Sequence, residues 1–372
     1  MKILQLVPGE GYADYLWDDV FGISRFFRDR GYSNEIYTDH MHRDFAEKGI
    51  QPISDLPKLT REDVIIYHKC ADTVLAADIN GMPCRKIIRF HGNLPARYWK
   101  SYSDVRTEDA ETSLRQLCEL AETMDYAIPE TRFQGSVLKT LHYRALITPC
   151  PPLFTFTEYA TAPDADLLQR YQENHIYTFL FTGKFTPNQK VEDVLQIFAC
   201  YVRYCDANAR LFLAGDLRVA PGYVRRLRQY AAGLEIEEQV IFLQTTSIPE
   251  TLSLYQMADM YIDMSEYAGF SAGLMESMYL GVPIIASDTQ EHRDILGENG
   301  IFLSTEDTAV FPMEGALFMA HVLEQKSLRR EISARQRRQQ QQYTHAALRK
   351  QWEECFTDFL ENVPPKARQR RR

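Results

Sequence analysis

The segment SEYAGFSAGLMESMYLG, residues 265–281, decides how the rest of this sequence is interpreted. It follows the apolar run MYIDM at 260–264 and contains a loop of small residues and then a helical pattern that ends at Gly281. This order predicts a buried strand, a loop and a helix with a glycine C-cap. Gly269 and Gly273 let backbone amides approach an anion at the start of the helix, where N–H groups and the helix dipole favour phosphate.

Glu276 lies about one turn inside the predicted helix. A carboxylate at that point is too close to phosphate to bind it, but it is well placed to accept hydrogen bonds from the hydroxyls of a ribose. The segment is therefore predicted to hold the phosphates and ribose of a sugar nucleotide. A tight turn with a surface carboxylate explains the same pattern without a ligand.

Short apolar runs alternate with amphipathic stretches along the whole chain, which is typical of βα units around a parallel sheet. Strands are expected in the first half at 2–7, 34–38, 64–68, 86–91, 126–128 and 145–148. Strands are expected in the second half at 177–182, 210–214, 239–243, 260–264, 283–286 and 300–303. We therefore predict two Rossmann-like, doubly wound α/β domains that face a central cleft, with ligands at the carboxyl ends of the strands.

The composition indicates a soluble globular protein that does not bind nucleic acid. The 372 residues are 45% hydrophobic and 25% charged, and the net charge of −9 leaves no general basic surface for nucleic acid. Seven cysteines without a CxxC pair predict reduced thiols, with neither a disulfide framework nor a zinc site. We expect no transmembrane helix and no signal peptide, and hence a cytoplasmic protein.

The C-terminal sequence KARQRRR, residues 366–372, carries five cations. Such a tail is attracted to anionic lipid headgroups, which would place the protein peripherally at the inner face of a membrane. A solvated, disordered end is the alternative interpretation.

The segment at 265–281 resembles the donor-site signature of retaining glycosyltransferases of family 4, which have the GT-B fold. Its matching positions are Gly269, Phe270, Glu276, Gly281, Val282 and Pro283. The resemblance implies that Glu276 binds the ribose hydroxyls of a UDP- or GDP-sugar. It also implies that backbone amides face the diphosphate, namely those of Phe270, Ser271, Ala272, Gly273 and Leu274.

A second segment, FTGKFTPNQKVEDVLQIF at 181–198, is similar to the family's phosphate-binding strand and helix. The resemblance implies that Lys184 and Lys190 neutralise the leaving diphosphate, a role that requires fixed positive charge. Gln189 occupies a position where the family has lysine. Taken alone, both cations also fit surface lysines. The base is expected near Thr245 and Thr246.

In the first half, residues 11–38 resemble the opening βα unit of the same family, which implies a phosphate or acceptor loop that includes Gly11, Asp14 and Trp17. The family places a histidine near the transferred sugar at the end of the strand that corresponds to 86–91. His91 is that residue, and Asn93 follows it in the same loop. A histidine that closes a buried strand is otherwise a satisfied core or rim residue.

The sequence departs from the family pattern at positions expected to contact the donor. Ala268 replaces the first acidic residue of the motif, and Glu266 lies two residues upstream. Lys184 replaces an arginine, which keeps the charge but loses bidentate geometry. Trp17 replaces a glycine, and its indole is able to fill part of the pocket.

These observations predict a GT-B type chain made of an N-terminal acceptor domain (1–155), a nucleotide-sugar donor domain (156–345), a helix that crosses back to the first domain (346–362) and a basic tail (363–372). The predicted activity is retaining transfer of a hexose from a UDP- or GDP-sugar to a glycan or lipid-linked acceptor in surface polysaccharide or glycoconjugate synthesis. The alternatives are a catalytically degenerate partner of another transferase and a different nucleotide-dependent enzyme such as an epimerase. No metal or other cofactor is expected, and the pair Asp18 and Asp19 is attributed to an acidic first helical turn.

Overall fold

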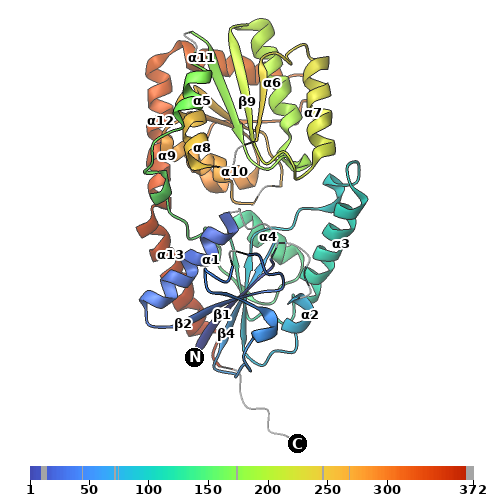
Figure 1. The fold of residues 1–372 in the computed structure, drawn as a ribbon, viewed down its shortest axis with the longest axis vertical. Coiled ribbons are helices and arrows are strands. Elements are labelled where there is room, and N and C mark those ends of the chain that lie inside the picture. The colour runs from blue at the N-terminus through green and yellow to red at the C-terminus, as the bar shows by residue number, and fades with distance from the viewer. Residues whose placement is uncertain are drawn as a thin grey trace, which may run out of the picture. The chain divides into compact units, whose positions relative to one another are not determined.

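The chain folds into two compact units, which we call unit 1 (Met1–Thr155 and Tyr343–Arg372) and unit 2 (Phe156–Gln342). The structure is a computed structural model that describes residues 1–9, 15–43, 45–70, 73, 75–172, 175–244, 247–267 and 269–365. Each unit is built on its own parallel sheet (Figure 1). The prediction of two doubly wound α/β domains is confirmed.

The sheet of unit 1 contains seven strands within the described part of the chain, in the order β3-β2-β1-β4-β5-β6-β7. They are β1 (Lys2–Val7), β2 (Ser33–Thr38), β3 (Ile50–Pro52), β4 (Val64–Lys69), β5 (Arg85–Phe90), β6 (Tyr126–Pro129) and β7 (Leu146–Ile147). Every residue of β4 and β5 is buried, as expected for central strands covered on both faces. The chain reverses its direction of strand addition between β1 and β4, and this is the topological switch point of the unit.

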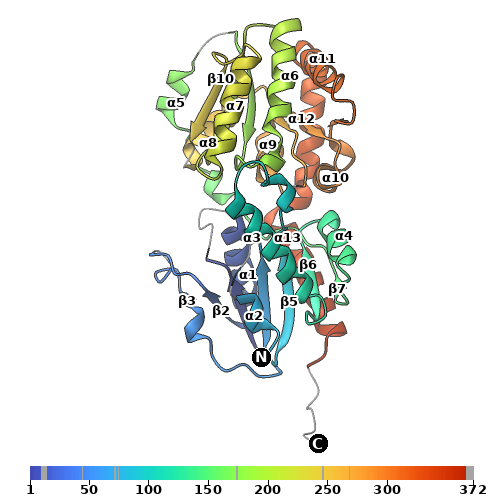
Figure 2. The ribbon, with the colours of Figure 1, turned by 90° about the vertical axis from the view of Figure 1, so that its right-hand side faces the viewer.

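The helices of unit 1 cover both faces of its sheet (Figure 2). They are α1 (Tyr15–Asp29), α2 (Leu75–Ile79), α3 (Asp104–Glu119), α4 (Arg132–Thr140) and α13 (His345–Asn362). Helix α13 is the predicted returning helix. Its Phe356 ring lies 4.8 Å from that of Phe27 on α1, and its Trp352 indole N–H donates to the carbonyl of Pro151 at 3.2 Å.

The sheet of unit 2 contains six strands within the described residues, in the order β10-β9-β8-β11-β12-β13. They are β8 (Tyr177–Thr182), β9 (Ala209–Gly215), β10 (Val240–Gln244), β11 (Met260–Asp263), β12 (Ile284–Ser287) and β13 (Phe302–Leu303). The helices are α5 (Ala165–Arg170), α6 (Val191–Tyr204), α7 (Pro221–Gly233), α8 (Ile248–Met257), α9 (Ala272–Leu280), α10 (Gln290–Leu296), α11 (Phe311–Glu324) and α12 (Lys326–Gln340). Its switch point lies between β8 and β11.

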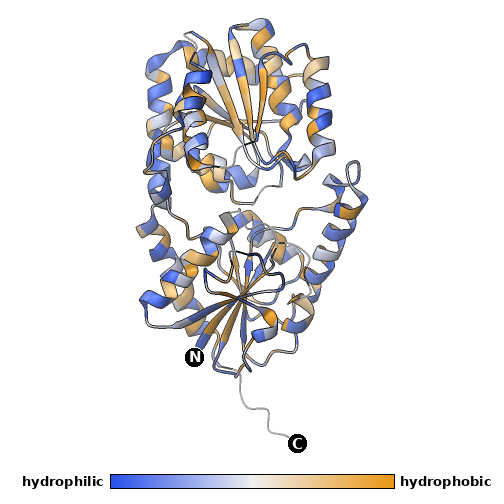
Figure 3. Ribbon diagram, viewed as in Figure 1, coloured by the Kyte–Doolittle hydropathy of each residue, from blue (hydrophilic) through white to orange (hydrophobic). Residues whose placement is uncertain are grey.

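Apolar residues are concentrated in the strands of both sheets, whereas the helices alternate between apolar and polar residues (Figure 3). This distribution places the core of each unit between its sheet and the covering helices. Helices α6 and α11 lie side by side in unit 2 and contact each other closely (Figure 2). In the described residues, no helix has the length and apolar character needed to cross a membrane.

Candidate functional site

The predicted donor segment lies at the switch point of unit 2, where the loop after β11 leads into α9. Ser271 is the N-cap of α9, because its Oγ accepts a hydrogen bond from the Leu274 amide at 3.3 Å. The same Oγ donates to Asp263 Oδ2 at 3.1 Å, which fixes the cap to the end of β11. Leu274 was predicted to offer its amide to phosphate, but here that amide is committed to the cap.

Gly273 is required by close packing in the first turn of α9. A Cβ added at this position would lie 2.0 Å from the hydroxyl oxygen of Tyr261. That hydroxyl donates to the carbonyl of Thr182 at 3.0 Å, so the tyrosine joins β11 to the end of β8. The glycine therefore lets the start of the helix come close to the ends of β8 and β11.

Glu276 is half-buried, and both of its carboxylate oxygens accept hydrogen bonds from tyrosines. Tyr159 donates to Oε1, and Tyr255 donates to Oε2 at 2.8 Å. Burial raises the pKa of Glu276, and the two hydroxyls partly counter this effect. The carboxylate predicted to accept from a ribose diol is thus already paired with two hydroxyl groups of the protein.

The loop between β8 and α6 places its two predicted cations differently. Lys184 is exposed, whereas Lys190 is half-buried in the left-handed conformation, with φ 48° and ψ 43°, at the N-cap of α6. The ammonium of Lys190 lies 3.6 Å from Glu266 and 3.9 Å from Asp193. The side-chain oxygen of Gln189 lies over Gly183, 3.5 Å from where a Cβ would be.

Burial and neighbouring charges shift the pKa values of Lys190 and Asp193. Burial alone would lower the pKa of Lys190, but Asp193, Glu266 and Glu192 together raise it. Burial raises the pKa of Asp193 to about 6, because Lys190 offsets only part of the desolvation. Glu266 is therefore a partner of the lysine here, and its amide also donates to the carbonyl of Asn188 at 2.8 Å.

A buried ion pair, which no motif of the sequence marks, lies at the end of β11 next to the N-cap of α9. His292 Nε2 lies 3.5 Å from Asp263 Oδ1, and its Nδ1 donates to the carbonyl of Ser287 at 2.8 Å. Burial alone would lower the pKa of His292, but Asp263 raises it above the ordinary value. Because Asp263 also holds the Ser271 cap, this pair anchors the start of α9.

In unit 1, His91 follows β5 and is only 8% exposed. Its Nδ1 lies 2.7 Å from Glu130 Oε1, and its Nε2 lies 2.9 Å from His68 Nδ1. Both ring nitrogens are therefore bound to the protein, and the position predicted for His91 near the transferred sugar stays a prediction.

Trp17 differs from the role predicted for it, and Asn93 lies in a buried hydrogen-bond network. Asn93 Oδ1 accepts from Ser113 Oγ at 2.5 Å, and the buried Lys69 ammonium donates to the same serine oxygen at 2.5 Å. Trp17 is not in a loop. It lies on α1, is 3% exposed and packs against Phe45 with ring centroids 4.7 Å apart. Its indole is part of the core of unit 1, because the amphipathic face of α1 points it toward the sheet.

The assignment of Asp19 to an acidic helical turn is wrong. Its side chain is fully buried, and Oδ2 accepts from Arg89 Nε at 2.7 Å. Oδ1 accepts from the amide of Leu153 at 2.6 Å. Asp19 therefore joins α1 to β5, which carries Arg89, and to the segment after β7 that contains Leu153.

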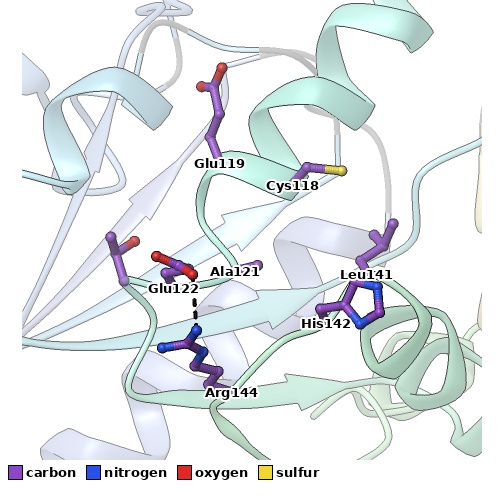
Figure 4. Close-up of a pocket in the computed structure, with 8 residues that line it drawn as sticks. Cys118, Glu119, Ala121, Glu122, Leu141, His142 and Arg144 are labelled. Atoms are coloured by element: carbon purple, nitrogen blue, oxygen red, sulfur yellow. Dashed lines mark ion pairs between the residues drawn. The ribbon is translucent and has the colours of Figure 1, made fainter.

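Several predicted positions lie outside the described residues. They are Gly11, Asp14, Thr245, Thr246, Ala268 and the basic tail from Lys366 to Arg372. A hollow of about 480 Å3 on unit 1 is formed by α3, the turn after it and the turn after α4 (Figure 4). Its walls include Cys118, Glu122 and His142, and none of the predicted site residues contributes to it.

The chain is similar to known proteins in sequence and in fold. Residues 170–339 match the family model described as "Glycosyl transferases group 1". The chain is 28% identical over 182 residues to N-acetyl-alpha-D-glucosaminyl L-malate synthase of Bacillus anthracis, a match that covers 48% of this chain and 44% of that protein. It is 31% identical over 109 residues to alpha-monoglucosyldiacylglycerol synthase of Streptococcus pneumoniae, covering 29% of this chain and 24% of that protein.

The curated relatives are thus matched over less than half of their length. Solved structures match over almost the whole chain. Anabaena HepE in complex with UDP-glucose superposes with a TM-score of 0.74 at 17% identity, over 96% of this chain and 100% of that one. Sucrose-phosphate synthase of Thermosynechococcus elongatus gives a TM-score of 0.69 at 13% identity, over 97% and 100%. The chain therefore has the GT-B fold, and its residues 170–339 match the model of the group 1 glycosyl transferases.

Proposed function

We propose that this protein is a retaining glycosyltransferase of family 4, which moves a hexose from a UDP- or GDP-sugar to a glycan or lipid-linked acceptor. The observation that carries the proposal is the switch-point arrangement of unit 2. There the loop after β11 leads into the capped start of α9, which carries Glu276, and the loop after β8 carries Lys190. Ligands in doubly wound sheets bind at this position.

The comparisons support a nucleotide-sugar donor. HepE was solved with UDP, with UDP and glucose, and with UDP-glucose, and its fold covers 96% of this chain. The two curated relatives are synthases whose names describe a malate and a diacylglycerol product. We accordingly place the activity in the synthesis of cell-surface polysaccharide or glycoconjugate, with the basic tail at 366–372 attracted to an anionic membrane surface.

The proposed reaction breaks the bond between the sugar C1 and the diphosphate oxygen and forms a bond from C1 to the acceptor oxygen on the same face. The acceptor proton passes to the leaving diphosphate. Lys184 and Lys190 would neutralise the charge that develops on that diphosphate. No metal is required in this scheme, because fixed cations and the amides at the start of α9 supply the positive field.

Binding of a donor requires two exchanges in the structure. The diphosphate has to replace Glu266 as the ion-pair partner of Lys190. The Glu266 carboxylate lies 3.6 Å from the Lys190 ammonium. The ribose hydroxyls have to replace at least one tyrosine on Glu276. The side chain of Glu266 is 41% exposed, so water solvates its carboxylate after the exchange, and a pair of this kind near the surface contributes on the order of 1 kcal/mol.

The proposal is tested by incubating the protein with a panel of UDP- and GDP-sugars and measuring nucleotide release with and without candidate acceptors. We expect release from one donor, and we expect Glu276→Ala and Lys190→Ala to suppress it. The matched control is Lys326→Ala, which removes an exposed lysine from the start of α12. If no nucleotide binds at millimolar concentration, both the activity and the donor site are refuted.

A catalytically degenerate protein that serves as a partner of another transferase is the second candidate. It is favoured by Ala268 at the position of the first motif carboxylate and by the protein partners that Lys190 and Glu276 already have. Nucleotide binding without transfer to any acceptor, together with co-purification of an active transferase, would select this candidate over the first.

A further inference from the structure

A continuous chain of buried side chains crosses the sheet of unit 1 along its hydrogen-bonding direction. It passes over strands β2, β1, β4, β5 and β6, which are neighbours in that order. Each strand contributes one side chain, in the last two cases from the residue directly after the strand. These are Asn34, Gln5, His68, His91 and Glu130, all 9% exposed or less.

Asn34 sets the direction in which hydrogen bonds are donated along this row of side chains. Asn34 Nδ2 donates to the carbonyl of Ile3 at 3.2 Å, so its Oδ1 faces Gln5 as an acceptor. Gln5 Nε2 donates to that Oδ1 at 3.0 Å and to the carbonyl of Val20 at 3.1 Å. Reversing the Gln5 amide would place its oxygen against two other acceptors. The amide orientation is therefore fixed by its partners.

The fixed oxygen of Gln5 determines where His68 carries its proton. Oε1 of Gln5 lies 2.9 Å from His68 Nε2 and has no proton to give, so Nε2 must donate. Burial lowers the pKa of His68 well below its ordinary value, and the charges of His91 and Arg89 lower it further. His68 is therefore neutral, and its Nδ1 presents a lone pair toward His91.

His91 must then donate from both sides of its ring. Its Nε2 lies 2.9 Å from the lone pair of His68 Nδ1, with the rings within 16° of parallel and their centroids 5.2 Å apart. These values place the rings edge to edge. On the other side, Nδ1 lies 2.7 Å from Glu130 Oε1, a carboxylate that accepts.

We infer that Gln5 fixes the tautomer of His68 and that His68 in turn holds His91 protonated on both ring nitrogens, as an imidazolium paired with Glu130. Gln5 and His68 are thus positioning residues for His91. The cation and Glu130 neutralise each other, and so do the neighbouring Arg89 and Asp19, which are joined at 2.7 Å. Such mutual neutralisation is what allows charges to remain buried.

Asp19, His68 and His91 are close enough to bind a metal ion together, because one ligand atom of each lies within 4.8 Å of the others. Their hydrogen bonds argue against such a site. Each of these atoms has a hydrogen-bond role in the arrangement described. The two carboxylate oxygens of Asp19 accept from Arg89 and from the Leu153 amide. The facing nitrogens of the two histidines share one proton at 2.9 Å, a separation too short for an ion between them.

The inference goes beyond the proposed transfer and constrains it, because an imidazolium has no lone pair. His91 cannot act as a general base or accept a hydrogen bond from a substrate hydroxyl. Its main-chain amide donates to the carbonyl of Lys69 at 3.0 Å, which fixes the start of the loop that contains Gly92 and Asn93. Gly92 has a φ of +107°, which a side chain would strain.

The test is a two-bond 1H–15N spectrum of the full chain labelled at histidine, recorded at pH 7. The signals of His68 and His91 are identified by their loss in His68→Gln and His91→Gln. We expect both nitrogens of His91 to have the chemical shift of protonated nitrogen. For His68 we expect a protonated Nε2 and an unprotonated Nδ1. An unprotonated Nε2 in His91 of the wild-type protein overturns the inference, whatever any variant does.

The causal part is tested with Gln5→Met, which keeps the side-chain volume and removes the acceptor. His68 should then move its proton to Nδ1 and donate to His91, whose Nε2 signal shifts into the unprotonated range. Gln336→Met is the matched control, because Gln336 is equally buried but hydrogen-bonds to Ile284 in unit 2. If a folded Gln5→Met leaves both rings unchanged, Gln5 does not set the tautomer. The readout needs no donor or acceptor, so it stands apart from the outcome of the transfer assay.

Discussion

Replacing Tyr159 by phenylalanine should make the protein bind its nucleotide more tightly. Tyr159 lies in the 3-10 turn Thr157–Tyr159, and its hydroxyl donates to Glu276 Oε1. A ribose hydroxyl that takes the same oxygen has to break this hydrogen bond. Phenylalanine removes the competitor and keeps the ring, which packs edge to face with Phe156 at 5.3 Å between centroids.

The size of the effect follows from the geometry. A hydrogen bond to a charged group contributes about 1.5–3 kcal/mol, and the half-buried carboxylate of Glu276 places this one at the low end because water partly replaces it. About 1.5 kcal/mol corresponds to roughly a tenfold lower Kd. Tyr255 should behave differently, because its hydroxyl also contacts Thr182 Oγ1 at 2.9 Å and the Gly273 carbonyl at 3.2 Å. Tyr255→Phe should therefore destabilise unit 2.

The assay is isothermal titration of the wild type and Tyr159→Phe with UDP and with a UDP analogue that lacks both ribose hydroxyls. The gain should appear with UDP and disappear with the analogue. Equal or weaker UDP binding by a folded Tyr159→Phe would refute the assignment of Glu276 as the ribose acceptor. A gain with both nucleotides would show that the tyrosine acts by obstruction and not through its hydrogen bond.

Three further predictions concern stability. Gly273→Ala places a Cβ 2.0 Å from the Tyr261 hydroxyl and should lower the free energy of unfolding in urea by about 1–3 kcal/mol. Gly222→Ala is the control, because the space around its Cβ is open, and it should be neutral or slightly stabilising. Asp19→Asn leaves the buried charge of its arginine partner uncompensated and should cost about 3–5 kcal/mol, and a change below 1 kcal/mol would contradict the assigned ion pair. Burial raises the pKa of Asp193 from 3.8 to about 6, so the folded state binds this proton more tightly than the unfolded state does. The stability that the bound proton contributes is complete below about pH 4 and is lost as the pH rises from about 4 to 6. Asp193→Asn should therefore be more stable than the wild type by roughly 2 kcal/mol at pH 7 and equal to it below pH 4, as measured by urea unfolding across that range.

The sheet architecture could be predicted because buried parallel strands leave short apolar runs in the sequence. Every strand was placed except β3 (Ile50–Pro52), which has three residues and ends in proline, too short to show a pattern. Helix α11 ends at Glu324 and α12 begins at Lys326, so two helices follow each other with one residue between them. No glycine or proline marks that break, so the local sequence carries no signal for it.

The site could be predicted in part. The start of α9 and the position of Glu276 follow from local spacing along one loop and one helix. The partners do not, because Tyr159 is 117 residues from Glu276 and Asp19 is 70 residues from Arg89 in the chain. The role of Trp17 was misjudged for the same reason. Whether a side chain on α1 faces a pocket or the core depends on contacts such as Phe45, which only the folded chain reveals.

The return of α13 to unit 1 makes that unit discontinuous in the chain and gives biosynthesis a fixed order. Phe26 and Phe27 on α1 are synthesised before unit 2, whereas Trp352 and Phe356, which pack against them, are synthesised after it. Unit 2 is synthesised in between and can complete its core while this apolar strip of unit 1 is still uncovered. The nascent protein thus passes through a stage at which one unit has folded and the other still exposes a surface that attracts chaperones or other unfolded chains.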